Sequence, residues 1–123
     1  MLESLERTSY RNYEIVVIDN GSDDAETIRY LGSLRHRVLA IPNPNGRFNY
    51  AYIHNEAVKR IDSEYVLFLN NDTVALKPEW LSQMVGYAHR KEQARRARLL
   101  FPDGRIQHAG ITHGFYKGMQ AFL

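Results

Sequence analysis

The chain has 123 residues, a net charge of +2 and an apolar fraction of 44%, which describe one small globular domain and exclude wholesale disorder. It contains no cysteine, which excludes disulfides and cysteine-ligated zinc. No apolar run is long enough for a membrane helix, and the charged start MLESLERTSYRNYE is unlike a signal peptide. We therefore expect a cytoplasmic protein, with peripheral attachment to the inner face of the membrane as the second option.

Strand-like and helix-like segments alternate along the first half of the chain. YEIVVID, residues 13–19, is rich in β-branched residues and predicts a buried strand that ends in the turn cluster NGSDD. Asp23, with Glu26 three residues later, predicts the capped start of a helix. The apolar face expected for this helix consists of Ile28, Leu31 and Leu34. RVLAI, residues 37–41, predicts a second strand, and the Pro, Asn and Gly of PNPNGRF predict a loop after it.

The alternation continues in the second half. Residues 49–61 predict a helix whose apolar positions recur at helical spacing. Residues 65–69 predict a third strand, and Pro78 and Glu79 suit the first turn of a helix that runs to about Ala88. LLFPDGRIQHAGI predicts two short strands around a Pro-Asp-Gly turn. This order predicts an α/β fold with right-handed βαβ units and a mostly parallel sheet.

Two polar clusters follow predicted strands: DNGSDD after the first and NNDT after the third. Because ligands bind outside the carboxyl ends of parallel strands, we expect both clusters at one edge of the sheet. Asp19 and Asn20 can exchange hydrogen bonds with a nucleobase, although a turn with a helix cap explains them as well. Asp72 can offer a carboxylate to Mg²⁺ or Mn²⁺, with amide contacts from Asn70 or Asn71. One carboxylate is a weak metal signal, and an ordinary turn is an equal alternative.

Other polar residues give weaker signals. His54 lies in a predicted helix and is interpreted as structural, and Trp80 as a core aromatic residue. His108 and His113 lack a third ligand and would make a poor zinc site. The basic run HRKEQARRAR, residues 89–98, is interpreted as a solvated helix face, with contact to an anionic partner as the alternative.

Four blocks occur in a specific order: YRNYEIVVIDNGSDD, FNYAYIHNEAVKR, SEYVLFLNNDT and PDGRIQHAG. Their order resembles the GT-A glycosyltransferases of family 2, closest to the bacterial branch of rhamnosyltransferase-like and O-antigen or cell-wall glycan enzymes. The resemblance covers residues 2–110. It implies a three-layer, Rossmann-like GT-A nucleotide-binding core, a nucleotide-diphosphate sugar donor, a divalent metal (Mn or Mg) and a glycan or lipid-linked acceptor.

The resemblance also implies roles for individual residues. Asn70, Asn71 and Asp72 match the family's DXD-like motif, so Asp72 is the implied metal ligand and Asn71 an implied nucleotide contact in place of a common aspartate. Asp19 and Asn20 match the nucleoside-contacting pair. Because many members have aspartate where Asn20 stands, the donor is left open between a UDP-sugar and a dTDP-sugar.

Three further positions carry looser implications. Arg47 is expected near the diphosphate, His108 on the acceptor side, and Asn55 in a shared helix block without an assigned role. The resemblance implies an inverting reaction, in which the metal stabilises the diphosphate leaving group and a carboxylate deprotonates the acceptor hydroxyl.

The sequence also departs from the family pattern. LESLERTSYRNYE resembles the end of the helix after the family's first strand, so that strand is expected to be missing. QARRARLL is shorter than the family's usual apolar strand block. The resemblance also implies that the motif of the catalytic base is expected beyond Leu123. We therefore expect one partial domain, residues 1–123, without the C-terminal acceptor part. Because a lost strand exposes its neighbours' edges, we expect a weakly stable monomer or a homo-oligomer.

Two alternatives to a glycosyltransferase remain. The chain can be a non-catalytic, degenerate fragment whose basic run, residues 90–98, binds an anionic partner; we expect no nucleic acid as the partner of the glycosyltransferase. A nucleotidyltransferase ranks lower, because a Gly-rich basic phosphate loop is absent. The residues leave open whether this chain is active by itself.

Overall fold

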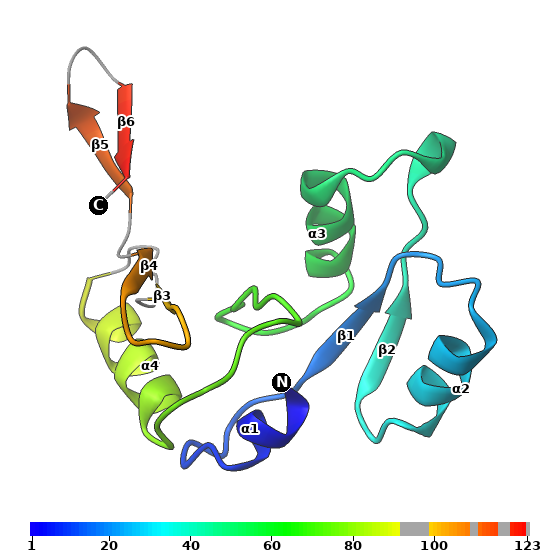
Figure 1. The fold of residues 1–123 in the computed structure, drawn as a ribbon, viewed down its shortest axis with the longest axis horizontal. Helices are drawn as coiled ribbons and strands as arrows, with labels where there is room; N and C mark the ends of the chain where they lie inside the picture. Colours follow the sequence, from blue (N-terminus) through cyan, green and yellow to red (C-terminus); the bar gives the residue numbers. More distant parts are fainter. Residues whose placement is uncertain (92–98, 109–110, 116–118, 123) are drawn as a thin grey trace. The chain divides into compact units, whose positions relative to one another are not determined.

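In a computed structural model of the chain, the described residues are 1–91, 99–108, 111–115 and 119–122 (Figure 1). The chain divides into two compact units. One unit is Asn12–Asn71, and the other combines Met1–Arg11 with Asp72–Leu123. Among the described residues, each helix is too short or too polar to span a lipid bilayer.

The unit Asn12–Asn71 begins with a β-α-β arrangement. Strand β1 (Val16–Asp19) is followed by helix α2 (Ala25–Ser33) and strand β2 (Arg37–Ala40). The two strands lie side by side and run in the same direction (Figure 1), paired in parallel from Val16 opposite Arg37 to Asp19 opposite Ala40. The predicted α/β class with a parallel sheet is confirmed.

The core of this unit lies where the sheet meets helix α3 (Tyr50–Val58), which follows a short 3₁₀ turn, η1 (Pro44–Gly46). Ile41, Ile53 and Ala57 are buried there. The partly buried residues packed against them are Ile18, Leu39 and Tyr52. The predicted helix therefore forms, and its positions 53 and 57 face the core, as the helical spacing indicated.

Helix α2 differs from the prediction in two ways. Its N-cap is Asp24 and not Asp23, because Asp24 Oδ2 accepts hydrogen bonds from the Thr27 backbone N–H (2.8 Å) and hydroxyl (2.9 Å). Thr27 thus replaces Glu26 as the residue paired with the cap. The helix also contributes no buried residue, and the side chain of Ile28 is 52% exposed. The expected apolar face is therefore not part of the core.

The third predicted strand, Tyr65–Leu69, is absent: these described residues belong to no strand. Their side chains are 38% to 46% exposed. An apolar run forms a strand only where a neighbouring strand supplies the backbone hydrogen bonds and other elements cover its faces. In the described residues, the parallel sheet consists of β1 and β2 alone.

The second unit contains helix α1 (Leu2–Glu6), helix α4 (Trp80–Lys91) and two antiparallel strand pairs. Strands β3 (Leu99–Leu100) and β4 (Ile106–His108) flank the Pro-Asp-Gly turn, as predicted. Gly104, with φ of 84°, closes that turn by donating its N–H to the Phe101 carbonyl at 2.9 Å. Strands β5 (Ile111–Phe115) and β6 (Met119–Phe122) form the other pair.

Hydrogen bonds fix the N-terminal segment of this unit to the chain that follows Asp72. The Ala75 N–H donates to Ser4 Oγ at 3.1 Å, and the Ser9 N–H donates to the Pro78 carbonyl at 2.9 Å. Trp80 Nε1 donates to Thr8 Oγ1, also at 2.9 Å, and Thr8 is only 1% exposed. Trp80 is thus an anchor with a specific polar partner, which the interpretation as a core aromatic residue did not foresee.

Candidate nucleotide-binding site

Asp19 ends β1, and its side chain organises the turn that follows. Its Oδ1 accepts hydrogen bonds from the Gly21 N–H (3.2 Å), the Ser22 N–H (2.9 Å) and the Ser22 hydroxyl (2.7 Å). Gly21 has φ of 92°, a conformation that side chains with a Cβ rarely adopt. The Ser22 hydroxyl, followed by the backbone donors, lowers the pKa of Asp19, so this carboxyl is ionised at neutral pH. Its second oxygen, Oδ2, accepts no hydrogen bond from the described residues.

Asn20, the next residue, is connected to the start of α3 through two other asparagines. Asn43 Nδ2 donates to Asn20 Oδ1 at 2.6 Å. The backbone N–H of Asn49 donates to Asn43 Oδ1 at 2.9 Å. Asn49 is in turn the N-cap of α3, where its own side chain accepts from the Tyr52 N–H at 3.0 Å. The end of β1, the loop after β2 and the start of α3 are therefore joined by one row of hydrogen bonds.

Arg47 follows the turn η1, in which Asn45 (φ 63°) and Gly46 (φ 65°) both have left-handed backbones. Its guanidinium is exposed and makes no hydrogen bond or ion pair with the described residues, including Asp19 and Asn20. The positive charge of Arg47 is thus unpaired among the described residues, and it lies on the loop that also contains Asn43.

Helix α3 is linked to the segment before Asn70 by an aromatic contact around His54. His54 Nδ1 lies 2.8 Å from the Tyr50 carbonyl oxygen. The centroids of the His54 and Tyr50 rings are 3.8 Å apart. Phe68 meets the His54 ring edge-on at 4.5 Å between centroids. His54 therefore packs against two aromatic side chains, which agrees with its interpretation from the sequence as a structural residue. The contact between Tyr50 and His54 was not among the predictions from the sequence. Their i, i+4 spacing on one helix is a signal that could have found it, whereas nothing in the sequence indicates Phe68.

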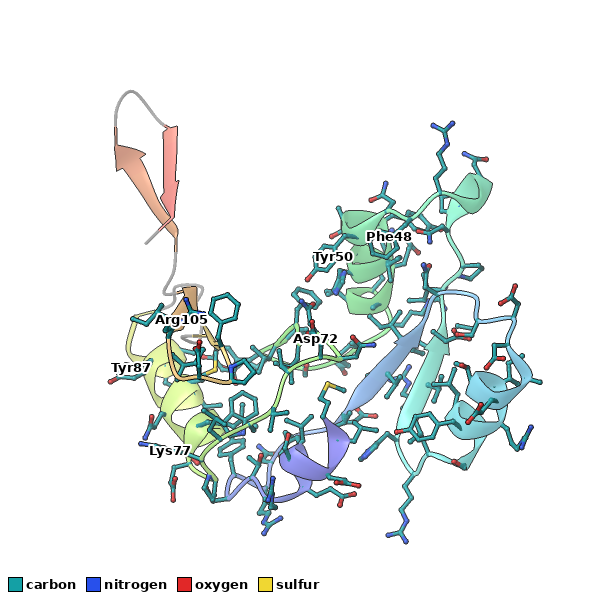
Figure 2. All side chains as sticks on the ribbon, in the orientation of Figure 1. Phe48, Tyr50, Asp72, Lys77, Tyr87 and Arg105 are labelled. Carbon is teal, nitrogen blue, oxygen red and sulfur yellow. The ribbon has the colours of Figure 1, made fainter. Side chains whose placement is uncertain are left out.

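Exposed residues dominate the other predicted cluster. Asn71 and Asp72 are exposed and lie in a turn, and Figure 2 labels Asp72 on its segment outside the helices and strands. The Asp72 carboxylate makes no hydrogen bond or ion pair with the described residues. Asn71 ends one compact unit, and Asp72 begins the second segment of the other. The expected meeting of the two clusters at one sheet edge stays a prediction.

The described residues contain no group of three or more histidine, aspartate and glutamate side chains that could hold a metal ion. A cation at Asp72 would therefore need ligands from a bound diphosphate and from water, which is the usual pattern for Mg²⁺. His108 and His113 lie on β4 and β5, but their side chains, like residues 92–98 of the basic run, are outside the described part.

The chain matches the family described as Glycosyl transferase family 2 over residues 1–97. The chain belongs to this family. The chain is 42% identical over 116 residues to the uncharacterized protein y4gI of Sinorhizobium fredii, covering 89% of this chain and 12% of that protein. It is 38% identical over 111 residues to the O-antigen biosynthesis protein RfbC of Myxococcus xanthus, covering 89% of this chain and 9% of that protein.

A third relative is the glycosyltransferase GlyA of Streptococcus pneumoniae, which is 31% identical over 84 residues, covering 67% of this chain and 11% of that protein. The family 2 chain thus spans about a tenth of the length of these curated relatives. No solved structure matches it. The resemblance to family 2 is confirmed, and the family match over residues 1–97 covers the first three of the four sequence blocks. The chain is thus a segment of this family with a GT-A type α/β fold.

Proposed function

We propose that this chain is the nucleotide-sugar-binding part of an inverting, metal-assisted glycosyltransferase. The donor is a UDP- or dTDP-sugar, and the acceptor is a glycan or a lipid-linked glycan. The observation that carries the proposal is the end of β1, where hydrogen bonds hold both Asp19 and Asn20 while each keeps one polar atom that the described residues do not use. Membership of family 2 and the similarity to an O-antigen biosynthesis protein support the same conclusion.

The nucleoside half of the site consists of Asp19 and Asn20 in this proposal. The ionised Asp19 carboxylate accepts a hydrogen bond from an N–H of the nucleobase or a hydroxyl of the ribose, through Oδ2. Asn20 supplies a second contact to the base. Arg47 places its charge near the diphosphate, and its exposure without an ion pair supports this role, since an arginine already paired would first have to give up its partner.

The metal half of the site is Asp72, with Asn71 supporting the nucleotide. The exposed carboxylate and amide oxygens fit a hard cation that takes one protein carboxylate and completes its shell with phosphate and water. When bound, Mn²⁺ or Mg²⁺ would neutralise the charge that develops on the diphosphate leaving group. We further propose that His108 lies on the acceptor side.

A nucleotide titration tests the proposal. Binding of UDP, dTDP and GDP is measured by thermal shift and calorimetry, each with and without Mn²⁺. We expect UDP or dTDP to bind, and to bind more tightly with the metal. Asp72→Ala should remove the metal-dependent part, whereas Asp62→Ala, which removes another exposed aspartate without a side-chain partner among the described residues, should keep it.

Two results would count against the proposal. If no nucleotide binds under either condition, the nucleotide-binding role of this chain is wrong. If Asp72→Ala retains the full metal-dependent gain in affinity, Asp72 is not the ligand and the metal binds elsewhere.

In the same preparation, size-exclusion chromatography with light scattering tests the expected self-association, which a single compact monomer across concentrations would contradict.

A further inference from the structure

The row of asparagines behind Asn20 fixes the orientation of its amide. Side-chain amide oxygen and nitrogen atoms are assigned from their hydrogen bonds, so the assignment needs one partner that is unambiguous. The Asn49 backbone N–H is such a partner, because it can only donate. It lies 2.9 Å from Asn43, so the atom that faces it must be the oxygen, Oδ1. The other end of the Asn43 amide, the N–H₂ group, is then the end that faces Asn20.

The same logic extends one residue further. The Asn43 N–H₂ group can only donate, so the Asn20 atom at 2.6 Å from it must be the oxygen. The N–H₂ group of Asn20 therefore points away from Asn43, and it donates to no acceptor in the described residues. Asn20 is only partly buried, which leaves this group within reach of a ligand.

From this geometry we propose that Asn43 is a positioning residue for nucleobase recognition. It turns the Asn20 amide so that the site offers an N–H donor, and not an oxygen acceptor, to the base. A uracil or thymine nucleotide fits this donor, because its base presents carbonyl oxygens at both O2 and O4, whereas cytosine presents one only at O2. The inference rests on the proposed nucleotide-binding function, and it assigns a role to a residue that does not itself touch the base.

Two different substitutions should replace the N–H donor that position 20 offers to the base with an oxygen acceptor. Asn43→Asp keeps an oxygen for the Asn49 N–H but cannot donate to Asn20, so the Asn20 amide must rotate to avoid two facing oxygens and then offers its oxygen outward. Asn20→Asp still accepts from Asn43 but has only oxygens to offer. Asn43→Asp, which does not touch the base, and Asn20→Asp, which does, are thus expected to lower the affinity for the ligand in the same way.

Asn45→Asp is the matched control. It adds the same negative charge to the same loop, and its positive φ of 63° is one that aspartate tolerates as asparagine does. UDP and uridine are both titrated, because uridine lacks phosphates and so reports the base contact without charge repulsion. We expect Asn43→Asp and Asn20→Asp to weaken both ligands about 10-fold relative to Asn45→Asp, the effect of losing one hydrogen bond to a neutral group.

CDP distinguishes which carbonyl of the base is contacted. If the contact is O4, both aspartate variants should bind CDP at least as well as the unmodified chain does, because cytosine has an amino group there. If the contact is O2, CDP should weaken together with UDP. The proposal is overturned if Asn43→Asp binds uridine as tightly as Asn45→Asp does while Asn20→Asp is weakened, because Asn43 would then not set the Asn20 amide.

A measurement without nucleotide keeps this inference separate from the proposed function. Hydrogen exchange of the side-chain amides, followed by NMR, should be slower for Asn43, whose N–H₂ donates within the protein, than for Asn20, whose N–H₂ faces outward. Asn20→Ala should then accelerate the exchange of Asn43. The reverse order of exchange would overturn the assigned orientation. A chain that shows the expected order but binds no nucleotide would refute the proposed function and limit Asn43 to ordering the loop, which would also overturn its recognition role.

Discussion

The two polar clusters of this chain follow apolar runs of similar character, yet their surroundings differ. At the end of β1, Asp19 and Asn20 are held by backbone and side-chain donors, and the Ile41 N–H pairs with the Asp19 carbonyl at 2.8 Å. At the end of Tyr65–Leu69, no strand forms, and Asp72 makes no hydrogen bond with the described residues.

The difference shows what a polar strand end needs before it becomes a preorganised site. Asp19 is ordered by a paired strand and a core behind it, whereas the chain beyond Asp72 is ordered from a distance, through Ser4, Ser9 and Thr8. Sites that are held before a ligand arrives lose less conformational entropy on binding. We therefore expect the Asp19 end to be preorganised and the Asp72 end to depend more on metal and phosphate.

The largest effect is expected from the core behind Asp19. Ile41 is 2% exposed and packs with Ile53 and Ala57, so Ile41→Ala should lower the free energy of unfolding by about 2–4 kcal/mol. Ile28→Ala on α2, where the side chain is 52% exposed, should cost less than about 1 kcal/mol. Urea unfolding followed by circular dichroism measures both. If both substitutions lowered the free energy of unfolding equally, the buried core around Ile41 would not be what stabilises the Asp19 end.

The hydrogen bond from Trp80 to Thr8, which anchors the segment beyond Asp72, is expected to contribute less to the free energy of unfolding than Ile41 does. Thr8→Val leaves the partly buried Trp80 N–H without its partner, the Thr8 hydroxyl, and should cost about 1–2 kcal/mol. Trp80→Phe removes the donor, so adding Thr8→Val to it should cost little more than Trp80→Phe alone. A double-mutant cycle by urea unfolding gives the coupling energy. Fully additive losses would contradict the hydrogen bond as the anchor.

Backbone conformation gives a smaller contrast between two glycines. Gly21 has φ of 92° in the turn after Asp19, so Gly21→Ala should destabilise the chain by about 1 kcal/mol. Gly86 lies inside α4 with nothing within 4 Å of an added Cβ, so Gly86→Ala should stabilise it by about 0.5–1 kcal/mol. Thermal unfolding should shift in opposite directions. A stabilising Gly21→Ala would show that the turn is not held as described.

The smallest effect concerns the acid dependence of Asp19. Its hydrogen bond from Ser22 lowers the folded-state pKa, so this contribution to stability is present above the ordinary aspartate pKa and is lost as pH falls through the folded value. Ser22→Ala should cost about 0.5 kcal/mol at pH 7, and the difference from the unmodified chain should shrink below about pH 4.

Ser33→Ala is the control for that pH dependence, because the Ser33 hydroxyl donates to the Tyr30 carbonyl and to no carboxylate. Its effect on unfolding should not change between pH 7 and pH 3. A Ser22→Ala effect that is equally constant over this range would show that Ser22 does not act through Asp19.

Much of the first half of the chain was predictable from local pattern. β1 and β2 lie within the predicted strands, because β-branched runs between turn residues have few other options. The cap of α2 was misplaced by one residue, since Asp23 and Asp24 both suit the position and only the Thr27 contacts decide between them. Asp19 and Asn20 were predictable as site candidates from their place after β1, but the partner of Asn20 was not.

The sequence by itself determined the family and the α/β class, because blocks, periodicity and turn chemistry are local and ordered along the chain. It also gave the candidate residues for nucleotide binding, which stay a prediction. The tertiary structure decided which apolar runs pair, because a strand exists only where neighbours supply its backbone hydrogen bonds; Tyr65–Leu69 lacks that pairing in the described residues. It also decided the orientation of Asn20, which depends on contacts with a loop 23 residues away.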